Sequence, residues 1–214
     1  MNINESINIK LFSRPCTFVI GATKSSLFPT DTSFPEIAFI GRSNVGKSSL
    51  LNAIVNRKDL ARASNTPGRT RQINFFLLDN KYFLVDLPGY GYAKAPKTEK
   101  SSWGELVVDY LRHRKNLTKL YLLIDSRHGI KKIDNEYMGM LNECGVPYQI
   151  VLTKIDKISQ QELQEKISSI ENAFQDNPAM MHKVIACSSS KSKHISTIRE
   201  DILISLGGEV ATNT

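Results

Sequence analysis

The stretch GRSNVGKSSL occupies residues 41–50 and directly follows the apolar run IAFI of residues 37–40. It fits the pattern G-x-x-x-x-G-K-[ST], in which the glycines let the backbone curl until successive N–H groups point inward. Those donors and the positive end of a following helix suit the phosphates of a nucleotide. Because an apolar run precedes the pattern and a helical pattern follows it, we interpret residues 41–48 as a phosphate loop. A glycine-rich turn that binds nothing is the alternative.

Short apolar runs alternate with amphipathic stretches along the rest of the chain. Several runs are apolar at every residue, which is typical of a sheet buried on both faces. The pattern therefore predicts an α/β fold with a doubly wound, mostly parallel sheet and helices on both faces. The predicted strands cover residues 16–22, 36–41, 73–79, 81–89, 119–126, 148–156 and 183–189. Predicted helices begin near Lys47 and cover roughly residues 98–115, 133–144, 159–174 and 192–207.

The run FFLLDNKYFLV, residues 75–85, departs from this alternation. Two strand patterns meet there at residues 79–81, which predicts a hairpin and one antiparallel edge strand. For the domains, we expect residues 1–34 to be an N-terminal extension that packs on a nucleotide-binding domain of residues 35–208. Residues 209–214 are predicted to be a disordered tail.

Composition is that of an ordinary globular protein, with 214 residues, 41% of them apolar and 23% charged. The net charge of +7 favours a phosphate-rich partner such as RNA, DNA or a membrane surface, although a basic protein without one is the alternative. Three cysteines without a CxxC pair indicate reduced structural thiols and no zinc site. No apolar stretch reaches the length of a signal peptide or a membrane span, so we expect a cytoplasmic protein without membrane association.

The phosphate loop alone does not separate ATP from GTP. Two residues of VDLPGYGYAK, residues 85–94, narrow the choice because Asp86 ends an apolar run and Gly89 follows three residues later. A carboxylate there can hold Mg²⁺ through a water, and a glycine N–H there can contact a terminal phosphate. Without the phosphate loop, D-x-x-G would be a common turn.

The stretch LTKID ends another strand pattern with Thr153, Lys154 and Asp156. An aspartate can accept hydrogen bonds from the N1–H and the 2-amino group of guanine, and adenine lacks both donors, so such a site rejects adenine. The lysine stem can pack over the base. An ordinary surface turn is the alternative. The last strand pattern ends in ACSSSK, where backbone amides near Ser188 and Ser189 could touch the guanine carbonyl.

Between the phosphate loop and Asp86 lies NTPGRTRQINFF, residues 65–76, whose Pro-Gly pair predicts a turn. Thr70 could give a second hydroxyl to Mg²⁺. Arg69 and Arg71 could meet phosphates of the nucleotide or of RNA, or they could belong to a polar surface loop.

These stretches together resemble a known family. GRSNVGKSSLLNA, TPGRTRQINFF, VDLPGYGYAK, TKID and CSSSK, in that order, are similar to the EngB (YihA/YsxC) family of small bacterial GTPases over roughly Phe18–Leu206. The resemblance implies a Ras-like P-loop GTPase fold of the Era-like branch. It also implies slow hydrolysis of GTP to GDP and phosphate and a role as a switch in assembly of the large ribosomal subunit, with rRNA and ribosomal proteins as partners. We expect the protein to be a monomer. Members of the family are further linked to normal septation and cell division. The alternatives are an RNA- or protein-binding module that a nucleotide stabilises with negligible turnover, and an ATP-using kinase or ATPase.

Matched position by position, the resemblance also assigns site residues. It gives the phosphates to Gly41, Arg42, Ser43, Asn44, Val45, Gly46, Lys47 and Ser48. It gives the switch contacts to Gly68, Arg69, Thr70, Arg71 and Gln72 and to Asp86, Leu87, Pro88 and Gly89. It gives the base to Thr153, Lys154, Ile155, Asp156, Cys187, Ser188 and Ser189, and Mg²⁺ to Ser48, to Thr70 and, through water, to Asp86. His194 stands where we expect a glycine before the last helix.

Tyr90 occupies the position after D-x-x-G, where Ras-type proteins carry a glutamine that orients the attacking water. We therefore expect slow intrinsic turnover that a partner stimulates. Asn44 could help to hold K⁺ beside the β- and γ-phosphates, where the cation would neutralise developing charge, although a turn former is the alternative. The candidate catalytic residues are thus Lys47, Thr70 and Asn44.

Two basic stretches are candidates for contacts with RNA. Tyr90, Tyr92 and Lys94, with Lys97 and Lys100 beyond them, interleave aromatic rings and cations, which predicts stacking on bases and neutralisation of phosphates. The cations of RHRKN, residues 112–116, have two equally good explanations. They could contact RNA, or they could stabilise the C-terminal end of a helix without any partner.

Overall fold

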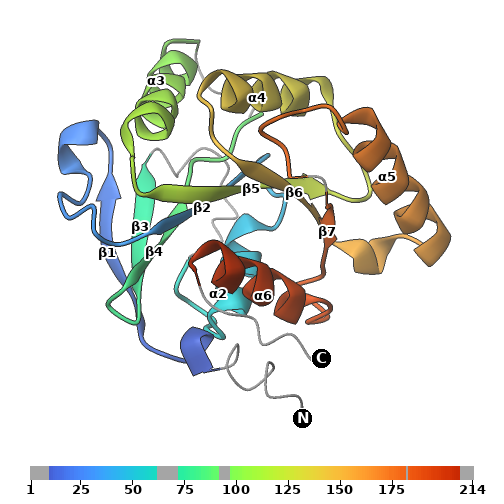
Figure 1. Ribbon diagram of the computed structural model, residues 1–214, viewed down its shortest axis with the longest axis horizontal. Helices are drawn as coiled ribbons and strands as arrows, with labels where there is room; N and C mark the ends of the chain where they lie inside the picture. The colour runs from blue at the N-terminus through green and yellow to red at the C-terminus, as the bar shows by residue number, and fades with distance from the viewer. Residues whose placement is uncertain (1–9, 62–71, 92–96, 182, 208–214) are drawn as a thin grey trace.

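A computed structural model describes residues 10–61, 72–91, 97–181 and 183–207 of the protein. Its centre is a seven-stranded sheet with the order β1-β3-β4-β2-β5-β6-β7 (Figure 1). The strands are β1 (Cys16–Ala22), β2 (Glu36–Gly41), β3 (Ile73–Leu78), β4 (Tyr82–Asp86), β5 (Leu117–Asp125), β6 (Tyr148–Thr153) and β7 (Ile185–Ala186). The helices are α2 (Lys47–Ile54), α3 (Lys97–His113), α4 (Lys132–Glu143), α5 (Gln160–Ala173) and α6 (Ile195–Ser205), with short 3₁₀ helices η1 (Ser25–Leu27) and η2 (Ile155–Lys157).

The sheet is mostly parallel with an antiparallel edge region, as the sequence predicts. Strands β4, β2, β5, β6 and β7 pair in parallel, whereas β3 runs antiparallel to both β4 and β1. Every residue of β2 and of β6 is buried. This burial on both faces explains why these strands are apolar runs without alternation.

The predicted hairpin is present between β3 and β4. Asp79 and Asn80 both have left-handed backbone, with φ of 51° and 52°, as a type I′ turn requires. The edge next to this hairpin is formed by β1, so a strand from the N-terminal segment completes the sheet.

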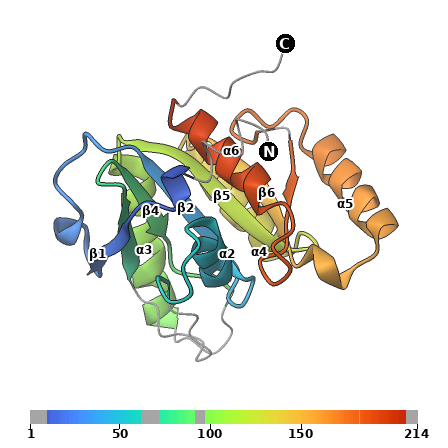
Figure 2. The same ribbon diagram turned by 90° about the horizontal axis from the view of Figure 1, so that it is seen from below.

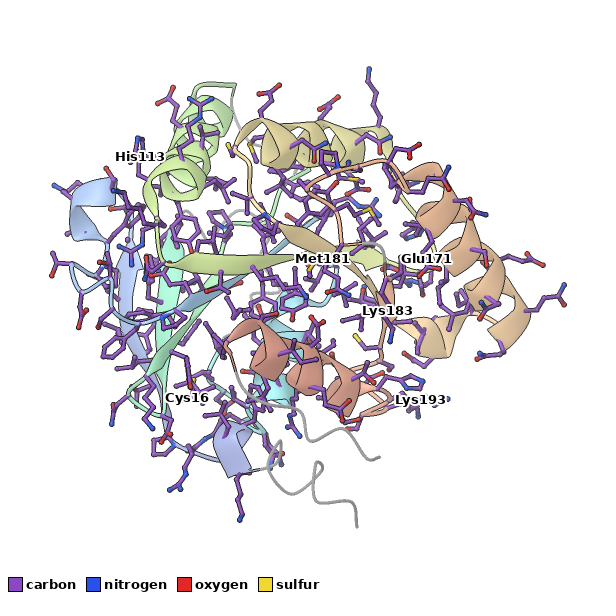
Figure 3. The ribbon with its side chains drawn as sticks, viewed as in Figure 1. Cys16, His113, Glu171, Met181, Lys183 and Lys193 are labelled. Carbon is purple, nitrogen blue, oxygen red and sulfur yellow. The ribbon has the colours of Figure 1, made fainter. Side chains whose placement is uncertain are left out.

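Helices cover both faces of the sheet and divide the core into two parts. Helices α3, α4 and α5 pack over one face, and α2 and α6 over the other (Figures 1 and 2). In Figure 3, His113 marks the end of α3 and Cys16 lies on the side of α2 and α6. Because β4, β2, β5, β6 and β7 run parallel, their carboxyl ends lie at one common edge of the sheet. Ligands bind at this edge in open α/β sheets. Within the described ranges, no helix has the length and apolar character needed to cross a membrane.

One of the candidate RNA contacts serves the fold instead. Glu36 at the start of β2 is fully buried, and Arg114, just after α3, forms an ion pair with it. The Tyr110 hydroxyl donates to the same carboxylate at 2.8 Å, and Arg114 also donates to the Pro29 carbonyl at 2.8 Å. The Arg114 side chain is only 7% exposed, so within residues 112–116 this cation is committed to a buried acid.

We expect Arg114→Ala to destabilise the protein by about 3–5 kcal/mol, because removing one partner of a buried ion pair leaves an uncompensated charge. The free energy of unfolding in urea measures this. The exposed neighbour Arg112 is the matched control, and Arg112→Ala should stay within about 0.5 kcal/mol of the unaltered protein. Equal stabilities of the two variants would contradict the structural role of Arg114.

Candidate nucleotide-binding site

The phosphate loop leaves β2 through positions where side chains have no room. A Cβ on Gly41 would lie 2.8 Å from the Leu123 carbonyl oxygen and 2.9 Å from Val45 Cγ1. Gly46, the N-cap of α2, has φ of 104°, which an L side chain rarely adopts. Asn44 is also left-handed, with φ of 64°. The loop therefore curls tightly into the N-terminus of α2, the arrangement that suits phosphate.

Lys47, the first residue of α2, forms an ion pair with Asp86 at the end of β4. Their side chains are 11% and 6% exposed. Ser48 follows in the first turn of the same helix. A carboxylate oxygen and a hydroxyl are hard oxygen donors of the kind that Mg²⁺ prefers, so this donor set fits the cation.

The TKID segment, residues 153–156, is attached directly to the phosphate loop. Thr153 Oγ1 donates to the Val45 carbonyl at 2.7 Å, and Lys154 Nζ donates to the Asn44 carbonyl at 2.6 Å. Lys154 has left-handed backbone, with φ of 57°. Loops more than a hundred residues apart in the sequence are thus held at a fixed separation, which a ligand that spans both requires.

The residues predicted to contact the base come from two strand ends. The Ser188 hydroxyl, after β7, donates to Asp156 Oδ1 at 2.6 Å, and this hydrogen bond lowers the pKa of Asp156. The Ile155 amide donates to the Cys187 carbonyl at 3.3 Å. Asp156 therefore stays ionised near neutral pH and is oriented as an acceptor. The Ser188 amide donates to the Lys193 carbonyl at 3.0 Å, and a contact between the guanine carbonyl and the amides near Ser188 and Ser189 stays a prediction.

Known proteins of similar sequence show the family to which the chain belongs. Residues 36–154 match the family described as 50S ribosome-binding GTPase. The probable GTP-binding protein EngB of Chelativorans sp. (strain BNC1) is 47% identical over 91% of this chain and 90% of its own length. That of Caulobacter vibrioides is also 47% identical, over 90% of this chain and 83% of its own length. The chain belongs to the EngB family of GTP-binding proteins.

Solved structures agree with this membership. The crystal structure of a probable GTP-binding protein engB is 26% identical, with a TM-score of 0.65 over 80% of this chain and 98% of that chain. Aquifex aeolicus Era Y63A bound to GDP.AlF4⁻ shares the fold, with 24% identity and a TM-score of 0.62 over 85% of this chain and 60% of that one. The predicted P-loop GTPase fold is thus confirmed, and a GTPase domain is a property of the family.

Asp125 is a residue of this EngB site that the sequence interpretation missed. It ends β5, is 4% exposed, and pairs with Lys154 Nζ at 2.9 Å and with Arg127 Nη2 at 2.7 Å. Burial alone would raise the pKa of Asp125, but the hydrogen bonds from Arg127 and Lys154 outweigh it and hold the pKa well below the ordinary value. Asp125 therefore holds Lys154, which links the TKID segment to the phosphate loop. Its place at the end of an apolar run was the available signal.

Tyr90 is buried, contrary to the prediction that its ring is presented to RNA. It is 5% exposed, stacks on Tyr137 of α4 at 3.8 Å between ring centroids, and donates its hydroxyl to Asp134 at 2.7 Å. Asp134 also lies 3.4 Å from Arg42 Nε. Burial, the Asp134 charge and that hydrogen bond raise the pKa of Tyr90 well above its ordinary value. The ring thus points into the α4 side of the molecule.

The backbone after Asp86 runs along the phosphate loop. The Ser43 amide donates to the Tyr90 carbonyl at 3.0 Å, and the Tyr90 amide to the Gly41 carbonyl at 3.2 Å. A Cβ on Gly89 would lie 3.4 Å from the Ser43 amide nitrogen, so this backbone is within contact distance of the phosphate loop. Leu87 and Pro88 are buried. Among the predicted site residues, Gly68, Arg69, Thr70 and Arg71 lie outside the described ranges, as do Tyr92 and Lys94 of the predicted RNA contact.

His194 stands where the family resemblance leads us to expect a glycine, and the backbone keeps the expected turn there. His194 is the N-cap of α6 and has left-handed backbone, with φ of 57°. The turn before it is closed by the Lys193 amide, which donates to the Ser188 carbonyl at 2.9 Å. The backbone conformation expected of a glycine is therefore kept, with the strain of a non-glycine residue.

Proposed function

We propose that the protein binds GTP, hydrolyses it slowly to GDP and phosphate, and thereby acts as a switch in assembly of the large ribosomal subunit. One observation carries the proposal: the phosphate loop is joined by an ion pair to Asp86 and by hydrogen bonds to Thr153 and Lys154, which belong to the segment that also contains Asp156. The match to a family described as 50S ribosome-binding GTPase and the net charge of +7 support a ribosomal partner. We also propose that the protein is cytoplasmic and that it is required for normal septation and cell division.

Different residues would bind the phosphates and the base of the nucleotide. Backbone amides of the phosphate loop and the Lys47 ammonium would bind the phosphates, while Asp156 would select guanine. Ser48, Thr70 and, through a water, Asp86 would hold Mg²⁺, which supplies neutralisation of phosphate charge when bound. Asp125 and Ser188 orient the base-binding side chains.

Slow turnover follows from Tyr90. The ring is stacked on Tyr137, and its hydroxyl is already engaged because it donates to Asp134. Position 90 of this chain thus lacks the water-orienting glutamine that Ras-type proteins carry there. We infer that a ribosomal partner completes the site.

Two measurements test the proposal. Calorimetry with Mg²⁺ should detect binding of GDP and GTP and a much weaker response to adenine nucleotides. Single-turnover hydrolysis should then be faster with large ribosomal subunits than without them. Binding without turnover under both conditions would favour the alternative of a nucleotide-stabilised binding module, and equal binding of ATP would favour a kinase or ATPase.

If Asn44 helps to hold K⁺, hydrolysis should be faster in K⁺ than in Na⁺, and removing its amide should abolish the difference. Asn44→Gly is the appropriate change, because alanine would be strained at φ of 64°. Single-turnover rates in the two salts measure the effect. Asn56→Gly is the matched control, since Asn56 is also left-handed, with φ of 51°, and follows α2 at its other end. Equal rates of the unaltered protein in both salts would reject the idea.

A further inference from the structure

A row of residues crosses the antiparallel part of the sheet beside Asp86. Strand pairing places Gly21 of β1 opposite Asn74 of β3, and Asn74 opposite Asp86 of β4. Directly opposite residues point to the same face of a sheet and touch there. The Asn74 side chain therefore faces the carboxylate that the proposed function assigns to the magnesium site.

Hydrogen bonds fix which end of the Asn74 amide meets Asp86. Gln72 Nε2 donates to Asn74 Oδ1 at 2.8 Å, and Asn74 Nδ2 faces Asp86 Oδ2 at 3.4 Å. Lys47 engages the other carboxylate oxygen, Oδ1. Because Gln72 occupies the acceptor end of Asn74, only the donor end remains for Asp86.

Gly21 provides the space in which Gln72 takes this position. An ideal Cβ on Gly21 would lie 2.2 Å from Gln72 Nε2 and 2.4 Å from Gln72 Cδ. The backbone of Gly21 does not have a positive φ, so a left-handed conformation is not the reason for glycine here. The Gln72 amide lies where a side chain at position 21 would be, so a larger residue there would displace that amide.

We propose that Asn74, oriented by Gln72 over Gly21, is a positioning residue that holds the Asp86 carboxylate in the plane needed for the Mg²⁺–nucleotide complex. The proposal rests on the proposed function, since it concerns the same site. The terminal torsion of an aspartate is broad, so a carboxylate held through one oxygen can still rotate. A donor on the second oxygen removes that freedom, and outer-shell partners of this kind commonly change metal affinity 10- to 100-fold.

The test measures how much Mg²⁺ tightens GDP binding. The dissociation constant of GDP is determined with Mg²⁺ and with EDTA, and their ratio is compared between variants. Asn74→Leu, which keeps the size and removes the donor, should lower the ratio about 10-fold and leave the value in EDTA nearly unchanged. Gly21→Ala should displace the Gln72 amide and lower the ratio about threefold, a smaller effect because Asn74 remains.

Matched controls separate positioning from loss of stability. Asn116→Leu removes another partly buried amide, which donates to the Phe34 carbonyl at 2.7 Å near the start of β5, and Gly139→Ala adds a methyl group in open space on α4. Both should keep the ratio of the unaltered protein.

The outcomes distinguish the two proposals. Unaltered protein that fails to bind GDP would overturn the proposed function. Unaltered protein that binds GDP equally with and without Mg²⁺ would overturn the magnesium assignment of Asp86 and, with it, the positioning role. A normal ratio in the unaltered protein together with unchanged ratios in folded Asn74→Leu and Gly21→Ala would overturn the positioning role alone. If Asn74→Leu does not fold, Gly21→Ala decides by itself: an unchanged ratio overturns the role and a lowered ratio supports it.

Discussion

Replacing Lys47 by methionine should weaken GDP and GTP binding on the order of 10²- to 10³-fold. The change keeps the apolar stem and removes the ammonium, which now balances the 6% exposed Asp86 carboxylate. Truncating one partner of a buried charge pair costs about 2–5 kcal/mol, and phosphates brought beside an unpaired carboxylate would add repulsion. Fluorescence titration with a labelled GDP measures the loss.

The control for Lys47 is Lys166, which lies on α5 and pairs with Glu162 at 3.0 Å, away from the phosphate loop. Lys166→Met should bind GDP like the unaltered protein. A folded Lys47→Met variant that binds GDP within about threefold of the unaltered protein would refute the assignment of the phosphate loop.

Asp156→Asn should exchange guanine for xanthine as the preferred base. An asparagine loses the charged acceptor for the guanine N1–H and 2-amino group, and a site built for such hydrogen bonds rejects the unmatched base strongly. We expect GDP affinity to fall on the order of 10³-fold and xanthosine diphosphate to become the tighter ligand.

Ser188 sharpens this expectation. Its hydroxyl donates to Asp156 Oδ1 at 2.6 Å, and an asparagine carbonyl can keep that bond. The amide nitrogen would then take the place of Oδ2, and an N–H can donate to the 2-oxo group of xanthine. Competition between the two diphosphates measures the exchange. Asp176→Asn, at an exposed position after α5, is the control. Unchanged preference in Asp156→Asn would mean that the base lies elsewhere.

Several features followed from the sequence because their causes are local. The phosphate loop needs glycines at fixed spacing between a strand and a helix, so its pattern survives in a short window. The hairpin turn depends on Asp79 and Asn80, which tolerate left-handed backbone. The parallel core was readable because strands buried on both faces are apolar throughout. The family resemblance joined these pieces into one GTP-binding fold, which the comparisons confirm.

Other features depended on contacts between distant residues. Tyr90 looked like an exposed aromatic ring beside lysines, but Asp134 and Tyr137, more than forty residues later, bury it. Arg114 looked like part of a basic run available to RNA, but it forms an ion pair with the buried Glu36. No local pattern encodes such pairs, because a side chain's partners are set by how strands and helices pack.

The sequence by itself therefore determined which chemical groups the protein carries at its strand ends, since backbone curl, strand burial and turn conformation are properties of short segments. The tertiary structure decided which of those groups face one another. The alignment of Gly21, Asn74 and Asp86 across neighbouring strands and the tie between Asp125 and Lys154 arise only from strand order and register. The physical reason is that hydrogen bonds and ion pairs act over a few ångströms, and only folding brings residues from distant parts of the chain within that range.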